Sequence, residues 1–168
     1  MKDELRDIDQ LLFTATTTHL TELHEDPEAK EYCGYNFQIQ NRKFKYRKAK
    51  LTPKKVGFFV TLWRRNQNQQ TEPFHESDDF DFYIIHTQDH DRSGYFIFPK
   101  SELIRQNILS TDSKEGKRGF RVYPPWSSTQ NKQAQKTQSW QTHFFIHSTN
   151  EPLQDTAKLN EILNSKQA

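Results

Sequence analysis

Apolar residues recur every three or four positions near both ends of the chain, which is the spacing of an amphipathic helix. The first stretch, residues 3–25, predicts a helix whose buried side consists of Leu5, Ile8, Leu11, Leu12, Ala15 and Leu23. Asp26-Pro27 ends this helix and favours a new short helical turn with Asp26 as its N-cap. A second long helix is expected over residues 131–146, and a short one within residues 150–168.

Between the predicted helices, apolar and polar residues alternate, which is typical of half-buried strands. Residues 36–40 and 44–51 alternate on either side of Asn41-Arg42 and predict a β-hairpin. Residues 58–63 are almost continuously apolar, as in a central strand. Ser101 can cap a short helix that starts at Glu102, and further strands are expected at residues 80–86, 95–98 and 120–123.

This order of elements predicts an α+β fold. We expect a single domain over residues 1–146, with a mixed or mostly antiparallel sheet of about five strands between an N-terminal and a C-terminal helix. Residues 147–168 are expected to form a helical tail that packs on this domain or is partly disordered. Only 32% of the residues are hydrophobic but 13% are aromatic, so the core is expected to contain mainly Phe and β-branched residues.

Three absences in the sequence bear on location. The single cysteine, Cys33, excludes an internal disulfide, and the charged N-terminus MKDELRDIDQ lacks the apolar run of a signal peptide. No stretch approaches the roughly 20 apolar residues that a membrane-spanning helix requires. We therefore expect a cytoplasmic protein without a membrane partner.

Charge is distributed in blocks that the formal net charge of +2 conceals. Tyr32 to Thr71 contains no Asp or Glu, and ten Lys or Arg lie between Arg42 and Arg65. A second basic block, residues 100–136, has eight basic residues against three acidic ones, whereas residues 1–31 have nine acidic residues against three basic ones. Because like charges repel one another in a folded chain, the basic blocks predict an anionic partner.

The basic residues suggest how phosphates would be bound. In GKRGFR, residues 116–121, the glycines allow backbone amides to approach an anion beside the cations, and Tyr123-Pro-Pro-Trp126 offers a rigid aromatic platform for a base. The expected phosphate-binding residues are Arg47, Lys50, Lys54, Lys55, Arg64, Arg65, Lys100, Lys117, Arg118, Arg121, Lys132 and Lys136. The residues expected to stack on the ligand or contact it are Trp63, Tyr123, Trp126, Gln138, Trp140 and Gln141. The alternative is a solvated hairpin that projects or lies at a sheet edge, where lysines discourage strand addition.

Catalytic chemistry has less support. The acids and histidines of residues 75–91 could bind a cation, but their spacing is that of a solvated strand face and a hairpin tip. Cys33 has no histidine nearby in the sequence, and no GxSxG motif occurs. The sequence therefore predicts no catalytic residue, no metal site and no cofactor.

Four runs of residues resemble the MepB-like proteins. They are FKYRKAKLTPKKVGFFVTLWRR at 44–65, FPK at 98–100, GKRGFRVYPPW at 116–126 and QAQKTQSWQ at 133–141. The resemblance covers roughly residues 30–146 and implies a bacterial cytoplasmic protein, without implying a biochemical activity. The expected strand order also distantly resembles PD-(D/E)XK nuclease-like folds, but the acid and the acid-x-Lys of those folds are missing here. That resemblance implies a degenerate core that keeps a nucleic-acid surface and lacks the metal.

Three functions remain open from the sequence. The first is binding of nucleic acid, with DNA favoured, without nuclease chemistry. The second is an enzyme or sensor for a small phosphorylated ligand or nucleotide, and the third is an interaction module in which the hairpin edge contacts an acidic protein. Binding of nucleic acid predicts cations arranged in a stripe along the surface. Binding of a small phosphorylated ligand predicts cations that converge on a pocket. The sequence does not define an oligomeric state.

Overall fold

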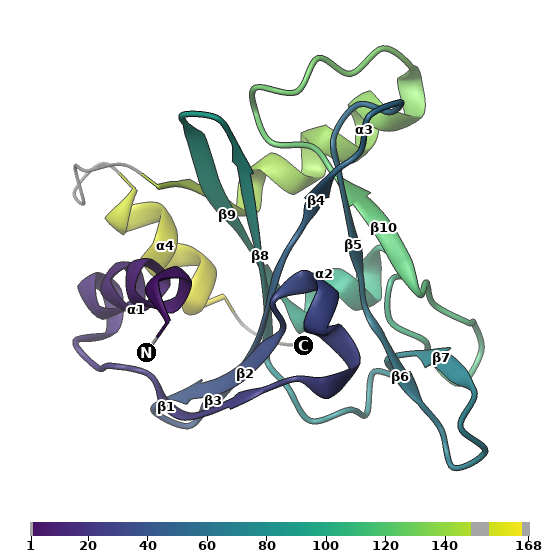
Figure 1. Ribbon diagram of the computed structural model, residues 1–168, viewed down its shortest axis with the longest axis horizontal. Helices are drawn as coiled ribbons and strands as arrows, with labels where there is room; N and C mark the ends of the chain where they lie inside the picture. Colours follow the sequence, from purple (N-terminus) through teal and green to yellow (C-terminus); the bar gives the residue numbers. More distant parts are fainter. Residues whose placement is uncertain (1, 149–154, 166–168) are drawn as a thin grey trace.

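A six-stranded mixed sheet forms the centre of the molecule (Figure 1). The computed structural model describes residues 2–148 and 155–165. The strand order is β1-β2-β3-β8-β9-β11. All neighbours are antiparallel except β3 and β8, which are parallel. The strands are β1 (Thr21–Glu25), β2 (Tyr35–Ile39), β3 (Arg42–Lys48), β8 (Phe82–Asp89), β9 (Arg92–Pro99) and β11 (Phe145–His147).

A second, three-stranded sheet has the order β10-β5-β4. It consists of β10 (Gly119–Val122), β5 (Phe58–Thr61) and β4 (Lys50–Leu51). After Leu62 the chain continues into a two-stranded ribbon, formed by β6 (Trp63–Arg65) and β7 (Thr71–Pro73). Figure 1 shows this ribbon projecting from the body of the molecule.

Each face of the large sheet is covered by its own hydrophobic core. The helices α1 (Asp3–Thr16) and α4 (Thr156–Leu163) contribute to the first core, together with Ile84. The second core includes Ile85 and lies between the large sheet, the small sheet and the helix α2 (Lys100–Arg105). The helix α3 (Lys132–Gln141) packs against this second core through Trp140. The α+β arrangement expected from the sequence is confirmed, with helices at both ends.

The N-terminal helix ends at Thr16, nine residues before the predicted end at residue 25. The Thr16 hydroxyl donates to the Leu12 carbonyl, and Thr17 adopts a left-handed conformation with φ 54°. The carboxylate of Asp9 then accepts a hydrogen bond from the Leu20 amide at 2.8 Å, which turns the chain back. Leu23 therefore lies in the exposed strand β1, and its place in a helix was predicted wrongly.

The C-terminal long helix is also shorter than predicted. The helix α3 ends at Gln141, and the 3₁₀ turn η2 (Thr142–Phe144) leads into β11. In β11, Phe145 pairs with Phe96 of β9, so a strand at the sheet edge replaces the last predicted helical turn. Part of the predicted helix of residues 150–168 forms α4, and residues 149–154 and 166–168 lie outside the described residues.

The predicted hairpin of β2 and β3 is confirmed, but its position at a sheet edge is wrong. The strand β3 lies between β2 and β8, and only its continuation β4 forms an edge, in the small sheet. The side chains of Phe44 and Tyr46 enter the first core. The alternate residues Lys45 and Arg47 face the other side of the sheet, where acidic and carbonyl groups must compensate their charge. The 3₁₀ turn η1 (Pro27–Tyr32) supplies one such group through its N-cap, Asp26.

Candidate nucleic-acid interface

Arg47 cannot contact a phosphate in this fold. Its side chain is 1% exposed, and Nη2 lies 3.0 Å from Oδ2 of Asp26. Nη1 donates to the carbonyl oxygen of Thr61 at 2.6 Å. The prediction of Arg47 as a phosphate ligand is wrong, because an interior strand buries this cation and Asp26 neutralises it.

Several other predicted cations have partners within the protein. Lys100 donates to the Asp78 carbonyl. Four cations form ion pairs with carboxylates at 3.2 to 3.5 Å: Lys50 with Glu31, Arg64 with Glu72 and Asp78, Arg65 with Glu28, and Arg118 with Glu115. These contacts partly neutralise the basic blocks, so the five cations are weaker candidates for phosphate binding.

Five lysines from the predicted set are exposed and have no hydrogen-bonding or ion-pair partner for their side chains within the described part of the chain. They are Lys54, Lys55, Lys117, Lys132 and Lys136. Lys54 and Lys55 lie in the loop between β4 and β5, Lys117 precedes β10, and the other two lie on α3. Because no carboxylate neutralises them, these five are the strongest candidates for phosphate contact.

Arg121 connects the strand β10 with the loop between β4 and β5. Its guanidinium donates to the carbonyl oxygens of Val56 at 3.1 Å and Gly57 at 3.2 Å, and to the Thr52 hydroxyl at 2.6 Å. Gly57 has φ +87°, and a Cβ atom there would lie 2.6 Å from the ring of Tyr123. Only glycine therefore fits at this position. Arg121 and Tyr123 hold the loop 52–57 against β10, and the guanidinium is largely occupied by this role.

Gln141 joins α3 to the same strand. Its side chain is fully buried, its Nε2 donates to the Arg121 carbonyl at 2.9 Å, and its Oε1 accepts from the Tyr123 amide at 2.8 Å. Both ends of the Gln141 amide, predicted as a ligand contact, thus satisfy backbone groups at the outer edge of β10, although Gln141 also lines the cavity between β10 and α3. Gln138 is similarly occupied, since it donates to the carbonyls of Pro124 and Ser127.

The three tryptophans of the predicted set are half-buried rather than free platforms. Trp140 packs on Phe98 with ring centroids 5.3 Å apart. Trp126 meets Phe145 edge-on at 5.6 Å, and the Arg65 guanidinium lies 5.4 Å from the centre of the Trp63 ring. Each tryptophan thus has a structural partner on one side and some exposed surface on the other.

A cavity of about 340 Å³ lies between β10 and α3. Its polar lining includes Lys117, Gln133 and Thr137, and its aromatic lining includes Tyr123 and Trp140. No Asp or Glu lines it, whereas Asp3, Glu4, Glu25 and Asp26 line the cavity of about 650 Å³ beside η1. The surface around β10 is therefore hollowed and basic, and its cavity offers no carboxylate that would repel an anion.

The comparisons with known proteins agree with the resemblance seen in the sequence. The family model for MepB-like proteins matches residues 26–147. The chain belongs to the MepB-like family. A solved structure titled "Crystal Structure of MepB" has 33% sequence identity and a TM-score of 0.76, covering 90% of this chain and 99% of that one.

A second solved structure similar to this MepB-like chain is a bacterial homing endonuclease, I-Ssp6803I. It has 11% identity and a TM-score of 0.43, over 83% of this chain and 88% of that one. Among curated proteins, no match was found. Among the described residues, no helix is both long enough and apolar enough to cross a membrane.

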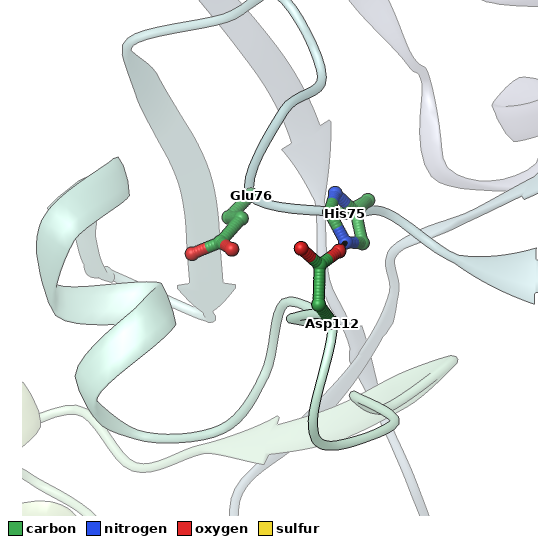
Figure 2. A group of neighbouring side chains, drawn as sticks. All are labelled: His75, Glu76 and Asp112. Carbon is green, nitrogen blue, oxygen red and sulfur yellow. Dashed lines mark hydrogen bonds and ion pairs between the residues drawn. The ribbon is translucent and has the colours of Figure 1, made fainter.

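Within the part of this MepB-like chain that the structure describes, one group of potential metal ligands occurs outside the basic surface. His75, Glu76 and Asp112 place their ligand atoms within 4.8 Å of one another (Figure 2). The Ser77 amide donates to Nδ1 of His75 at 3.1 Å, so Nε2 carries the proton and donates to Asp112 at 3.1 Å. A cation at Nε2 would have to displace this hydrogen bond. Asp112 was missed from the sequence because backbone pairing of His75 with Ser110 brings the two segments together.

Proposed function

We propose that this MepB-like chain binds nucleic acid through the phosphate backbone, with duplex DNA as the preferred form. The supporting observation is the set of exposed lysines without an internal partner within the described residues, Lys54, Lys55, Lys117, Lys132 and Lys136. Phosphate contacts from lysines supply affinity and fix the position of a protein on DNA. No catalytic step is part of the proposal.

The spacing of these lysines favours a polymer. The strand β5, residues 58–61, separates the loop 52–57 from the end of β10 that Lys117 precedes, and four extended residues span about 13 Å at roughly 3.3 Å each. Lys117 lies toward the ribbon end, because Gly119 pairs with Thr61 while Val122 pairs with Phe58. Figure 1 shows the β4–β5 loop and the ribbon at opposite ends of one side of the molecule. This separation is several times the roughly 3.4 Å axial rise between successive phosphates of one DNA strand, so the lysines at the two ends of β5 would contact different phosphates.

The test is fluorescence anisotropy with duplex and single-stranded DNA, titrated with salt. Wild-type protein should show a linear loss of log K with log salt, and each of Lys54→Gln and Lys117→Gln should reduce the slope by about 0.9. The matched control is Lys30→Gln, since Lys30 is exposed but lines the acidic cavity beside η1. An affinity that does not change with salt, or an equal effect of all three substitutions, would overturn the proposal.

The cavity between β10 and α3 favours a second candidate, a small phosphorylated ligand. Its volume of about 340 Å³ lies at the lower end for ligand pockets. Lys117 could meet a phosphate while Tyr123 and Trp140 contact an aromatic ring. A thermal-shift screen with nucleotides tests it: a rise in melting temperature that Thr137→Phe abolishes and Lys54→Gln leaves unchanged would favour this candidate.

The third candidate, an acidic protein partner, depended on an exposed hairpin edge. The strand β3 is covered by β2 and β8, so residues 42–48 offer no free edge to a partner strand. Only the two residues of β4, Lys50 and Leu51, lie at an edge. The structure thus gives no specific observation that favours this candidate.

A further inference from the structure

The tip of the β6–β7 ribbon has an unusual composition. Residues 66–70 read Asn-Gln-Asn-Gln-Gln, five consecutive amide side chains between two strands. The tip contains neither a charged nor an apolar side chain. The register Arg65↔Thr71 places it at the far end of a ribbon that projects from the body (Figure 1).

The first of these amides holds the turn. Oδ1 of Asn66 accepts from the Asn68 amide at 2.8 Å and from the Gln70 amide at 3.1 Å. The backbone of Asn66 also bonds to Gln70 at 2.9 Å, and Gln69 has φ 61°. The side chains of Gln67, Asn68, Gln69 and Gln70 are exposed and have no hydrogen-bond partner within the described residues. The tip therefore presents four side-chain amides, each with a free donor and a free acceptor, on a turn that Asn66 stabilises.

We infer that this ribbon enters the major groove of duplex DNA and that its tip amides read base edges, with a preference for adenine. The inference rests on the proposed function. The major groove is about 12 Å wide and admits a two-stranded β-ribbon, and Gln or Asn side chains pair with N6 and N7 of adenine in a bidentate manner. An uncharged tip suits base edges, because a base edge can engage both the donor and the acceptor of an amide side chain, whereas a phosphate engages only its donor.

Hydrogen bonds next to the tip hold it in a fixed relation to the basic surface. Nη2 of Arg118 donates to the Thr71 carbonyl at 3.0 Å, and Arg65 donates to the Gln69 carbonyl at 3.0 Å. Glu72, the acid of β7, is paired with Arg64 at 3.2 Å. Lys117, next to Arg118, can then contact a phosphate beside the groove that the tip occupies. Phosphate binding by Lys117 would thereby set the register in which the amides meet the bases.

The experiment is selection of binding sites from a random duplex library, compared between wild type and the triple variant Gln67→Ala, Asn68→Ala, Gln70→Ala. The variant keeps Asn66 and Gln69, which form the turn. We expect wild type to enrich a short motif containing adenine, with about a tenfold loss of affinity for each wrong base pair. The triple variant should lose this preference and keep the salt slope of non-specific binding. A control with Gln88→Ala and Gln130→Ala, two exposed amides elsewhere, should select the wild-type motif.

A second probe tests the chemistry directly. Replacing the selected adenines by 7-deazaadenine removes the N7 acceptor, so wild-type affinity should fall about tenfold and that of the triple variant should stay constant. Salt-dependent binding with no enriched motif would overturn this inference and leave the proposed function standing. An unchanged motif in the triple variant would do the same, whereas absence of any duplex binding would overturn both.

Discussion

Arg47 shows how one residue from a basic run becomes part of the structure. It lies in the same strand as Lys43 and Lys45, yet its guanidinium is buried and bonded to Asp26 and Thr61. Asp26 in turn accepts a hydrogen bond from the Glu28 amide as the N-cap of η1. The pair therefore links η1, β3 and β5.

Asp26→Asn should destabilise the protein strongly. The amide can still cap η1, but it leaves the buried charge of Arg47 without a counter-ion, and breaking a buried pair in this way costs about 3–5 kcal/mol. Urea denaturation measures the free energy of unfolding. The control is Lys50→Gln, because the Lys50–Glu31 pair is exposed and should contribute at most about 1 kcal/mol. Equal effects of the two substitutions would show that the buried pair is not important for stability.

His86 makes stability depend on pH. Burial, with a smaller contribution from Lys48, lowers the pKa of His86 from 6.5 to about 4. Its Nε2 lies 2.9 Å from Oγ of Ser93, its ring stacks on Tyr95 at 4.7 Å, and its Nδ1 is buried without a partner within the described residues. The folded protein therefore excludes the proton that the unfolded chain takes up below pH 6.5.

The direction of this pH dependence follows from the linkage between proton binding and folding. Because the pKa is lower in the folded state, the stabilisation is complete above pH 6.5 and declines as pH falls toward 4. Between pH 7.5 and pH 5 the loss from this residue should be about 2 kcal/mol. His86→Phe keeps the stacking on Tyr95 and should show a smaller loss over the same interval. Urea denaturation measures the free energy of unfolding at each pH. If it changes with pH equally in wild type and in the variant, His86 is not the source of the pH dependence.

At the scale of elements, local patterns predicted the hairpin of β2 and β3 and the cap at Asp26, since both depend on neighbouring residues. The ends of the two long helices were not predictable in this way. The carboxylate of Asp9 and the pairing of Phe145 with β9 are tertiary contacts, and they override a helical pattern that would otherwise continue. The edge position of β3 was wrong for the same reason, because its parallel partner β8 lies 34 residues beyond it, from Lys48 to Phe82.

The attachment of α3 to β10 through Gln141 gives an element-scale prediction. Gln141→Leu keeps a side chain of similar size but leaves the Arg121 carbonyl and the Tyr123 amide without partners, which should cost about 2–4 kcal/mol. Hydrogen exchange at the Tyr123 amide should accelerate as the strand edge opens. Gln135→Leu, at an exposed position of the same helix, should change neither quantity appreciably. Unchanged exchange at Tyr123 in the Gln141 variant would contradict this role.

At the scale of the whole molecule, the sequence located the two basic blocks but could not say which cations are free. Acidic residues from distant segments decide this: Asp26 pairs with Arg47, and Glu28 with Arg65. The five predicted lysines that have no such partner among the described residues come from both blocks, and the pairing of β5 with β10 brings the two blocks together in the folded state. Most of the aromatic and amide residues of the predicted site instead make contacts that hold the loop 52–57, β10 and α3 together.

The large sheet contributes residues to both cores, so we expect the two cores to unfold as one cooperative unit. Ile84 and Ile85 are both fully buried neighbours on β8, and they face the first and the second core respectively. Ile84→Ala and Ile85→Ala should each cost about 2–5 kcal/mol. Because β8 is shared, either substitution should lower the midpoint of a single unfolding transition. Tryptophan fluorescence and far-ultraviolet circular dichroism measure this midpoint independently.

The two probes differ in what they detect, which makes the comparison informative. Trp126 and Trp140 both pack against the second core, so fluorescence follows that side, whereas circular dichroism includes α1 and α4 on the other side. If the sheet couples the two halves, Ile84→Ala shifts the fluorescence midpoint although it removes no contact of the second core. A fluorescence midpoint equal to that of wild type, with an earlier transition by circular dichroism, would mean that the α1 side unfolds by itself.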